Sequence, residues 1–434
     1  MPTPFDIFLS DDTPWSGRLV GRLVWDDAAQ ISARRMAFQY DSDWCRTGFA
    51  LGADLPLTDK IQYLPQVFGK ASQGIAPYSR QQSFGFVSDW APGAWLADLL
   101  HAARLNRLDW VPSQSLCTPS RLWAGSGNEK DRFSSFKLPI THSFQTKHDI
   151  DYFEKKRFGQ LVNALQRLQT RPETLNKAQL EDLRNTVVNL GGQSVKALVV
   201  GRLDGDQEAA WVVRASPMRV DFNVARWQAI GMGLAQWCGL SIIKNAFLDS
   251  TLGGAYLEKR FDRTDQGRSL LCVSAATLIK TTLMPGRPPR AATYADIADV
   301  LNREGASPKK DLAELFSRLL FNTLTGNRHD HLSDFWFYRS ALGWRLAPFN
   351  GVSIQPPDQK IRLMNTPIIG NDNSADPELS LSVSRYFGLS LSEAKEKKLA
   401  MQQALMNWNK LAKSMKATKS EIDLAAGSFS TDVA

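Results

Sequence analysis

Two short polar stretches contain the residues whose types and spacing could do chemistry. In the first, Gly191 and Gly192 precede Lys196, and a glycine pair lets backbone N–H groups approach a phosphate closely. The second runs from His329 to His331 (HDH), with Asp334 three residues later, and it offers groups that can accept a proton or bind a divalent cation. Alone, the glycine pair is also what an ordinary turn would show. Together the two stretches are parts that a phosphoryl-transfer site needs.

The elements expected around these stretches come in a definite order. The periodicity predicts helices at 151–169 and 177–188, strands at 197–203 and 209–214, a helix at 223–239, a strand at 255–261, and helices at 293–303 and 309–325. A glycine loop, a hairpin, a helix, a further strand and a helical lobe form the chain order of a bilobal protein-kinase-like fold. The predicted fold class is therefore α+β.

The chain before residue 125 has a different pattern. Alternating stretches such as 17–25 and a helical pattern at 95–105 predict a small α/β domain over residues 1–125. The charged, glycine-containing stretch 124–132 then marks a boundary. We expect residues 126–265 to form the kinase-like lobe with the glycine loop, and residues 266–434 to form the helical lobe.

Near the C-terminus, apolar residues recur at helical spacing. The stripe consists of Met401, Leu405, Trp408, Leu411 and Met415, and the opposite set contains Lys397, Lys410, Lys413 and Lys416. A solvated surface is the favoured interpretation of the lysine set, ahead of a face that binds a partner.

Composition limits the classes of protein to which the chain can belong. Its 434 residues are 43% hydrophobic, which suffices for a large core, and no run approaches the roughly 18 apolar residues of a membrane-spanning helix. The start lacks the order of a signal peptide, so we expect a cytoplasmic protein. The net charge of +8 is modest, and it allows direct or indirect association with DNA or another acidic partner. The scattered cysteines are expected to be reduced and structural: Cys45, Cys117, Cys238 and Cys272.

Several motifs resemble the HipA family in the same order along nearly the whole chain. They are Gly21-Arg22-Leu23, Leu55-Pro56-Leu57, Gly191-Gly192 through Lys196, Glu258 through Arg263 (EKRFDR), Gly326-Asn327 through Asp330-His331, and Trp344 through Pro348 (WRLAP). The resemblance implies a bacterial serine/threonine kinase toxin that a small DNA-binding antitoxin, HipB-like, neutralises. It also implies that the nucleotide would lie against Gly191, Gly192, Lys196, Arg214, Gln228, Glu258, Arg260 and Phe261.

At six positions the chain departs from the family pattern. Arg214 stands where the family has a lysine, and Gln228 stands where it has the glutamate that pairs with that lysine. In the catalytic loop, His329 stands in place of the catalytic aspartate and Asp334 in place of an asparagine. Gly351 stands in place of the magnesium-binding aspartate, and Asn189 in place of a serine that can be autophosphorylated. The neutral side chain of Gln228 cannot form an ion pair with a cationic side chain. Gly351 has no side chain with which to ligate a metal. Arginine also differs from lysine in its reach toward phosphate. ATP and magnesium are therefore expected to bind weakly or not at all.

The favoured hypothesis is a toxin–antitoxin pseudokinase that binds a HipB-like antitoxin or a companion HipA-like kinase. The alternative is an active kinase in which Asp330 is the base and Asp334 carries magnesium. A weaker alternative is a nucleic-acid-binding protein or a metal-dependent nuclease that uses the HDH triplet.

Overall fold

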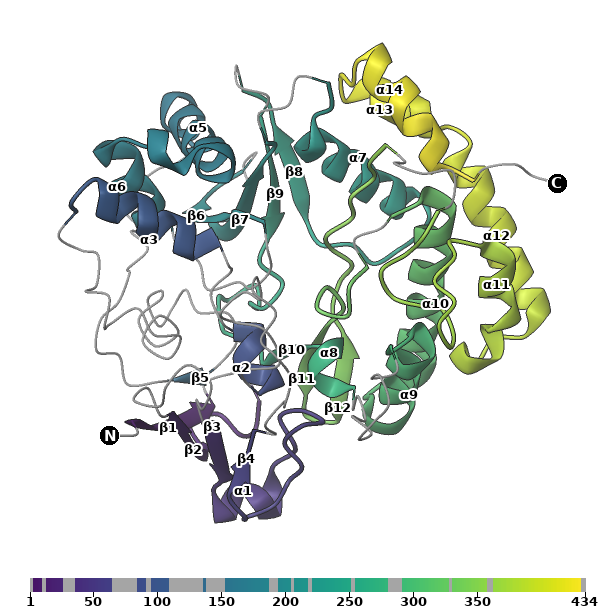
Figure 1. Cartoon of the computed structure of the whole chain (residues 1–434). Coiled ribbons are helices and arrows are strands. Elements are labelled where there is room, and N and C mark those ends of the chain that lie inside the picture. The colour runs from purple at the N-terminus through teal and green to yellow at the C-terminus, as the bar shows by residue number, and fades with distance from the viewer. Residues whose placement is uncertain are drawn as a thin grey trace. The chain divides into compact units, whose positions relative to one another are not determined.

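A computed structural model of the chain forms two compact units (Figure 1). The first comprises Met1–Arg214 with Asp262–Val273, and the second Ala215–Phe261 with Ser274–Ala434. The residues that the structure describes are 3–9, 13–25, 36–64, 84–90, 95–108, 136–137, 153–186, 194–203, 207–217, 221–250, 254–279, 291–327, 330–356 and 362–430. The boundary near residue 125 lies outside them, and the division into three domains stays a prediction.

The first unit begins with a five-stranded sheet in the order β4-β3-β2-β1-β5. Its strands are β1 (Thr3–Leu9), β2 (Leu19–Trp25), β3 (Met36–Tyr40), β4 (Gln62–Tyr63) and β5 (Phe136–Lys137), and the short helices α1 (Ser42–Thr47) and α2 (Gly85–Trp90) follow β3 and β4. The antiparallel register sets Leu23 opposite both Phe5 and Phe38, so one face of the sheet is apolar. Phe86 of α2 packs on it, with its ring 5.7 Å from that of Phe38.

Helices and a hairpin complete this unit. They are α3 (Trp95–Leu105), α5 (Lys155–Thr170), the 3-10 turn η2 (Pro172–Thr174), α6 (Lys177–Asn185), β6 (Ala197–Gly201) and β7 (Ala209–Ala215). The helix predicted at 177–188 ends earlier, because the N–H of Thr186 folds back onto the carbonyl of Leu183. The Thr186 carbonyl instead accepts the N–H of Leu198 at 2.8 Å, and this joins α6 to the hairpin.

The second unit carries most of the predicted helices. Its elements up to residue 346 are α7 (Val224–Trp237), β8 (Asn245–Leu248), β9 (Ala255–Lys259), α8 (Ala275–Leu278), α9 (Tyr294–Glu304), α10 (Pro308–Thr325), β11 (Trp336–Ser340) and β12 (Gly343–Leu346), and the strand β10 (Cys272–Ser274) precedes α8. The expected caps are confirmed: Thr293 forms a capping box at α9, and Gly326 ends α10 in the left-handed region. The strand predicted to reach Phe261 stops at Lys259.

The C-terminal stripe is divided between two helices. The last elements are α11 (Pro377–Ser382), the 3-10 turn η3 (Ser384–Phe387), α12 (Leu391–Leu405), α13 (Trp408–Ser414), α14 (Lys419–Ala425) and the 3-10 turn η4 (Ala426–Ser428). Lys397 does not belong to a solvated face, because its ammonium donates to Ser317 on α10 at 3.3 Å. None of the described helices is both long and apolar enough to cross a bilayer.

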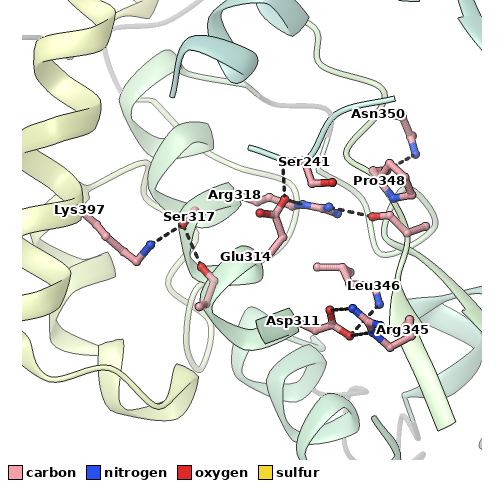
Figure 2. Close-up of polar contacts among 12 residues, drawn as sticks. Ser241, Asp311, Glu314, Ser317, Arg318, Arg345, Leu346, Pro348, Asn350 and Lys397 are labelled. Atoms are coloured by element: carbon pink, nitrogen blue, oxygen red, sulfur yellow. Dashed lines mark hydrogen bonds and ion pairs between the residues drawn. The ribbon is translucent and has the colours of Figure 1, made fainter. Parts of the chain in front are cut away.

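Two arginines tie α10 to β12 and to the residues that follow it (Figure 2). Asp311 is 3% exposed and accepts both the Nε and Nη2 hydrogens of Arg345, at 2.8 and 3.1 Å. Arg318 donates to Glu314 at 2.9 Å and to the carbonyl of Ala347 at 2.8 Å. Burial lowers the pKa of Arg318, and the adjacent Glu314 opposes this. Buried charges persist only when paired in this way.

Replacing Arg345 with alanine should strongly destabilise the second unit, because it leaves the Asp311 carboxylate buried without its bidentate partner. We expect the free energy of unfolding to fall by about 2–4 kcal/mol, as measured by chemical denaturation. Arg303→Ala is the matched control, since its pair with Asp299 is more than half exposed on both sides and should cost less than about 0.5 kcal/mol. Equal losses in the two variants would contradict this account.

Candidate functional site

A hydrogen bond from a backbone N–H to a side-chain carboxylate joins the loop after β12 to strand β9. The N–H of Gly351 donates to Oε1 of Glu258 at 3.2 Å, and the hydroxyl of Tyr256 donates to the same oxygen at 2.9 Å. Glu258 is 4% exposed. A buried carboxylate needs such donors, because burial without them is costly. The structure thus brings together two of the predicted site positions, Glu258 and Gly351.

The loop that contains Gly351 is held by its backbone on both sides. The N–H of Phe349 donates to the carbonyl of Ser241 at 2.7 Å, and the N–H of Ile243 donates to the carbonyl of Phe349 at 3.0 Å. Farther along, Ser353 donates its N–H to Oδ1 of Asn327 at 3.1 Å. The path of this loop is therefore fixed by hydrogen bonds on both sides of Gly351.

Gly351 itself has a φ of +72°, which residues with a side chain rarely adopt. Open space surrounds the position that a Cβ would occupy. An aspartate would fit there sterically, at a backbone cost of roughly 1 kcal/mol. Magnesium ligation needs oxygen donors, and this position supplies none. The described residues therefore do not fit a magnesium site centred on Gly351.

Asp330 lies in a buried hydrogen-bond network. Its side chain accepts the N–H of Asn365 on Oδ1 at 2.7 Å and the hydroxyl of Tyr294 on Oδ2 at 3.0 Å. Its carbonyl accepts the hydroxyl of Thr366. Asp330 is 1% exposed, and burial raises the pKa of its carboxyl to about 7 against the opposing effect of these hydrogen bonds. Both oxygens are already engaged within the protein.

The network continues into α10 through residues that the sequence analysis missed. Asn322 donates to the Tyr294 hydroxyl at 2.9 Å and accepts from the Asn327 amide at 2.9 Å. Tyr294 and Asn322 are completely buried. The available signal was an asparagine within the apolar stripe of α10, because a buried amide must find partners.

The other residues of the HDH region lie in different surroundings. His329 is outside the described residues, whereas His331 and Asp334 are exposed. The N–H of Asp334 donates to the carbonyl of His331 at 2.7 Å, which forms a turn. In the part of the chain that the structure describes, no group of three or more His, Cys, Asp or Glu side chains could hold a metal ion.

The remaining predicted site residues lie on several elements. Lys196 is buried directly before β6, and Arg214 is half-buried in β7, whereas Gly191 and Gly192 lie outside the described residues. Gln228 is half-buried on α7. In the second unit, Arg260 is 4% exposed, and the ring of Phe261 lies 6.0 Å from that of Trp336.

Helix α7, which carries Gln228, is anchored to α14 at its first turn. The N–H of Asn223 donates to Glu421 at 2.8 Å, and the Arg226 guanidinium lies 3.6 Å from the same carboxylate. Glu421 is 4% exposed and also caps α14 through Thr418. The acidic partner of the first turn of α7 therefore comes from the C-terminal helices.

A model of the HipA-like C-terminal domain matches residues 188–426, which is more than half of the chain. The chain belongs to the HipA-like family. Among solved structures, it is similar to HipA of Shewanella oneidensis MR-1, in a toxin–antitoxin complex of HipA, HipB and operator DNA. The two share 14% identity at a TM-score of 0.60, over 98% of this chain and 94% of that one. The predicted α+β, kinase-like fold of HipA is thereby confirmed.

A weaker likeness links this family member to the Helicobacter pylori proinflammatory kinase CtkA. The identity is 10% and the TM-score 0.33, over 51% of this chain and 94% of that one. No curated protein matches the chain.

The raised pKa of Asp330 makes the stability depend on pH. In the folded state, Asp330 keeps its proton from about pH 4 to about 7. In the unfolded chain, where its pKa is 3.8, Asp330 loses the proton over this range. The free energy of unfolding should therefore fall by a few kcal/mol as pH rises through this window. In Asp330→Asn, thermal melts between pH 5 and 8 should show a shallower decline.

Asp372→Asn is the control, because hydrogen bonds from Ser374 lower the pKa of Asp372 and keep it ionised throughout this range. Its melting profile should follow that of the wild type. A wild-type slope in Asp330→Asn would show that another group causes the pH dependence.

Proposed function

We propose that this HipA-like protein is a toxin–antitoxin component that keeps the kinase-like fold but acts by binding and not by phosphoryl transfer. The observation that carries the proposal is Gly351: backbone hydrogen bonds fix its loop, yet the residue presents no metal ligand. Phosphoryl transfer depends on cations that neutralise the charge developing on the phosphate oxygens.

The surroundings of Asp330 support the same proposal. A general base must lie within hydrogen-bond reach of the substrate proton, but Asp330 is buried with both oxygens occupied by Tyr294 and Asn365. An active kinase with Asp330 as base would have to break this network at each turnover. Asp334 is exposed and could contribute one carboxylate to a metal, which is the best argument for that alternative.

Three departures from the family's motifs, noted in the sequence, add to this argument. Arg214 keeps a cation on β7, whereas Gln228 cannot provide the carboxylate that would pair with it in an active kinase. His329 replaces the aspartate that the family uses as base. Each change weakens a different step of the same reaction, and we infer that ATP binds weakly and without a strong requirement for magnesium.

The proposed partner is a HipB-like DNA-binding antitoxin or a companion HipA-like kinase in the cytoplasm. The solved complex of the Shewanella HipA with HipB and operator DNA supports the first choice. A metal-dependent nuclease is a weaker candidate, because the Asp330 carboxylate of the HDH triplet is engaged in the protein interior.

Wild-type protein incubated with labelled ATP and magnesium should neither autophosphorylate nor label a general protein acceptor, and it should still co-purify with its co-expressed antitoxin. Asp334→Ala is the diagnostic variant, because this exposed side chain can be removed without opening the core. Robust phosphate transfer that falls by about 10²- to 10⁴-fold in Asp330→Asn, or is lost in Asp334→Ala, would overturn the pseudokinase proposal.

The missing metal ligand can be tested by ligand-induced stabilisation. Adding magnesium and ATP should leave the melting temperature of the wild type nearly unchanged, but should raise that of Gly351→Asp, because a ligand that binds only the folded state stabilises it. Gly351→Asn is the matched control, with a similar volume at the same φ but no charge. A large magnesium-dependent shift in the wild type would contradict the proposal.

A further inference from the structure

The positive charge of the chain is concentrated in one short segment of the second unit. Between Lys397 and Lys419 there are six lysines and no carboxylate, although the whole chain has a net charge of only +8. Four of these lysines recur at every third residue: Lys410, Lys413, Lys416 and Lys419. The proposed kinase-like site uses none of them.

All four lysines are exposed: Lys410 and Lys413 lie on α13, Lys416 follows that helix, and Lys419 begins α14. Trp408 stacks on Phe429, with ring centroids 4.3 Å apart, and lies 6.2 Å from Trp227 of α7. Ala412 is completely buried, so the opposite side of α13 faces outward. Every exposed residue between 409 and 420 is polar: Asn409, Lys410, Lys413, Ser414, Lys416, Thr418, Lys419 and Ser420.

Lys416 occupies an unfavourable backbone position. Its φ is +60°, and the only other described residue with a positive φ that is not glycine is Arg107. The turn is closed by Lys416 N–H to Lys413 O and Ala417 N–H to Ala412 O, both at 2.9 Å, which is the helix end where glycine is preferred. Backbone strain at a residue whose side chain is exposed points to a role for that side chain.

The nearby acids do not neutralise this segment. Glu421 is buried and is occupied by Asn223, Arg226 and Thr418. Asp423 is exposed on α14, but its single negative charge cannot neutralise four lysines. The Lys410–Lys419 surface therefore keeps a strong positive charge.

The residue types favour nucleic acid over an acidic protein. Protein interfaces have an apolar, often aromatic centre, whereas here all the exposed residues are polar. Lysine, asparagine, serine and threonine are the side chains that contact phosphate oxygens. Trp408 is stacked on Phe429 and cannot serve as a platform for single-stranded bases.

We propose that the Lys410–Lys419 surface binds the sugar-phosphate backbone of duplex DNA without reading its sequence. The choice of DNA over RNA rests on the proposed partnership with a DNA-binding antitoxin. The four lysines would displace condensed counterions from the phosphates, and this makes the affinity steeply dependent on salt.

The experiment measures binding of the full-length protein alone to a fluorescent DNA duplex of arbitrary sequence over a series of salt concentrations. The wild type should bind with a dissociation constant of about 10⁻⁴ to 10⁻⁶ M. Replacing all four surface lysines with glutamine should make the slope of log affinity against log salt shallower by about 3 to 4.

The matched control makes the same change of net charge at four other exposed lysines: Lys60, Lys177, Lys309 and Lys310. Its salt dependence should stay close to that of the wild type. An equal loss in both variants would show that only the net charge matters and would overturn the proposal.

Two further arms complete the test. Lys416→Gly should raise the melting temperature while weakening binding to DNA, so weaker binding cannot be attributed to misfolding. Tighter binding to polyglutamate or to an RNA duplex than to DNA, at equal salt, would also overturn the proposal. Co-purification with the antitoxin in the absence of DNA reports separately on the proposed function.

Discussion

Hydrogen bonds to backbone groups fix the path of the loop after β12, in addition to its buried side chains Phe349, Val352 and Ile354, and the candidate site depends on this constraint. Arg318 binds the carbonyl of Ala347, Glu258 accepts the N–H of Gly351, and Asn327 accepts the N–H of Ser353. Buried backbone groups must be paired, so three side chains from β9, α10 and the residue after the α10 cap determine the path of the loop. None of these contacts needs a side chain at position 351.

Because these hydrogen bonds need no side chain at position 351, they hold the loop whether or not that residue carries a metal ligand. The hydrogen-bond network of Asp330 likewise needs no bound metal or substrate. Its partners Tyr294, Asn365 and Thr366 all belong to the protein, so it contributes to stability whether or not a substrate is present.

Local patterns predicted much of the helical framework. Helix α3 covers the predicted range, and Thr293 and Gly326 mark the ends of α9 and α10 because capping depends on nearby residues. The break between α12 and α13 was missed, since the apolar spacing continues across residues 406 and 407. The polar network was missed because Tyr294 and Asp330 are 36 residues apart. The positions of catalytic residues came from the family resemblance, which compares residue types and contains no information on burial.

The carboxylate of Glu258 next to Gly351 gives the glycine a physical rationale. Glu258 is buried, and its Oε1 lies 3.2 Å from the Gly351 nitrogen. An aspartate at position 351 would set a second negative charge close to Glu258, and two carboxylates in a low-dielectric site repel unless a cation lies between them. With magnesium bound, that arrangement is favourable; without it, the aspartate costs stability. Without a bound cation, the chain is therefore more stable with an uncharged residue at this position. Among uncharged residues, glycine adopts the required φ of +72° with the least strain.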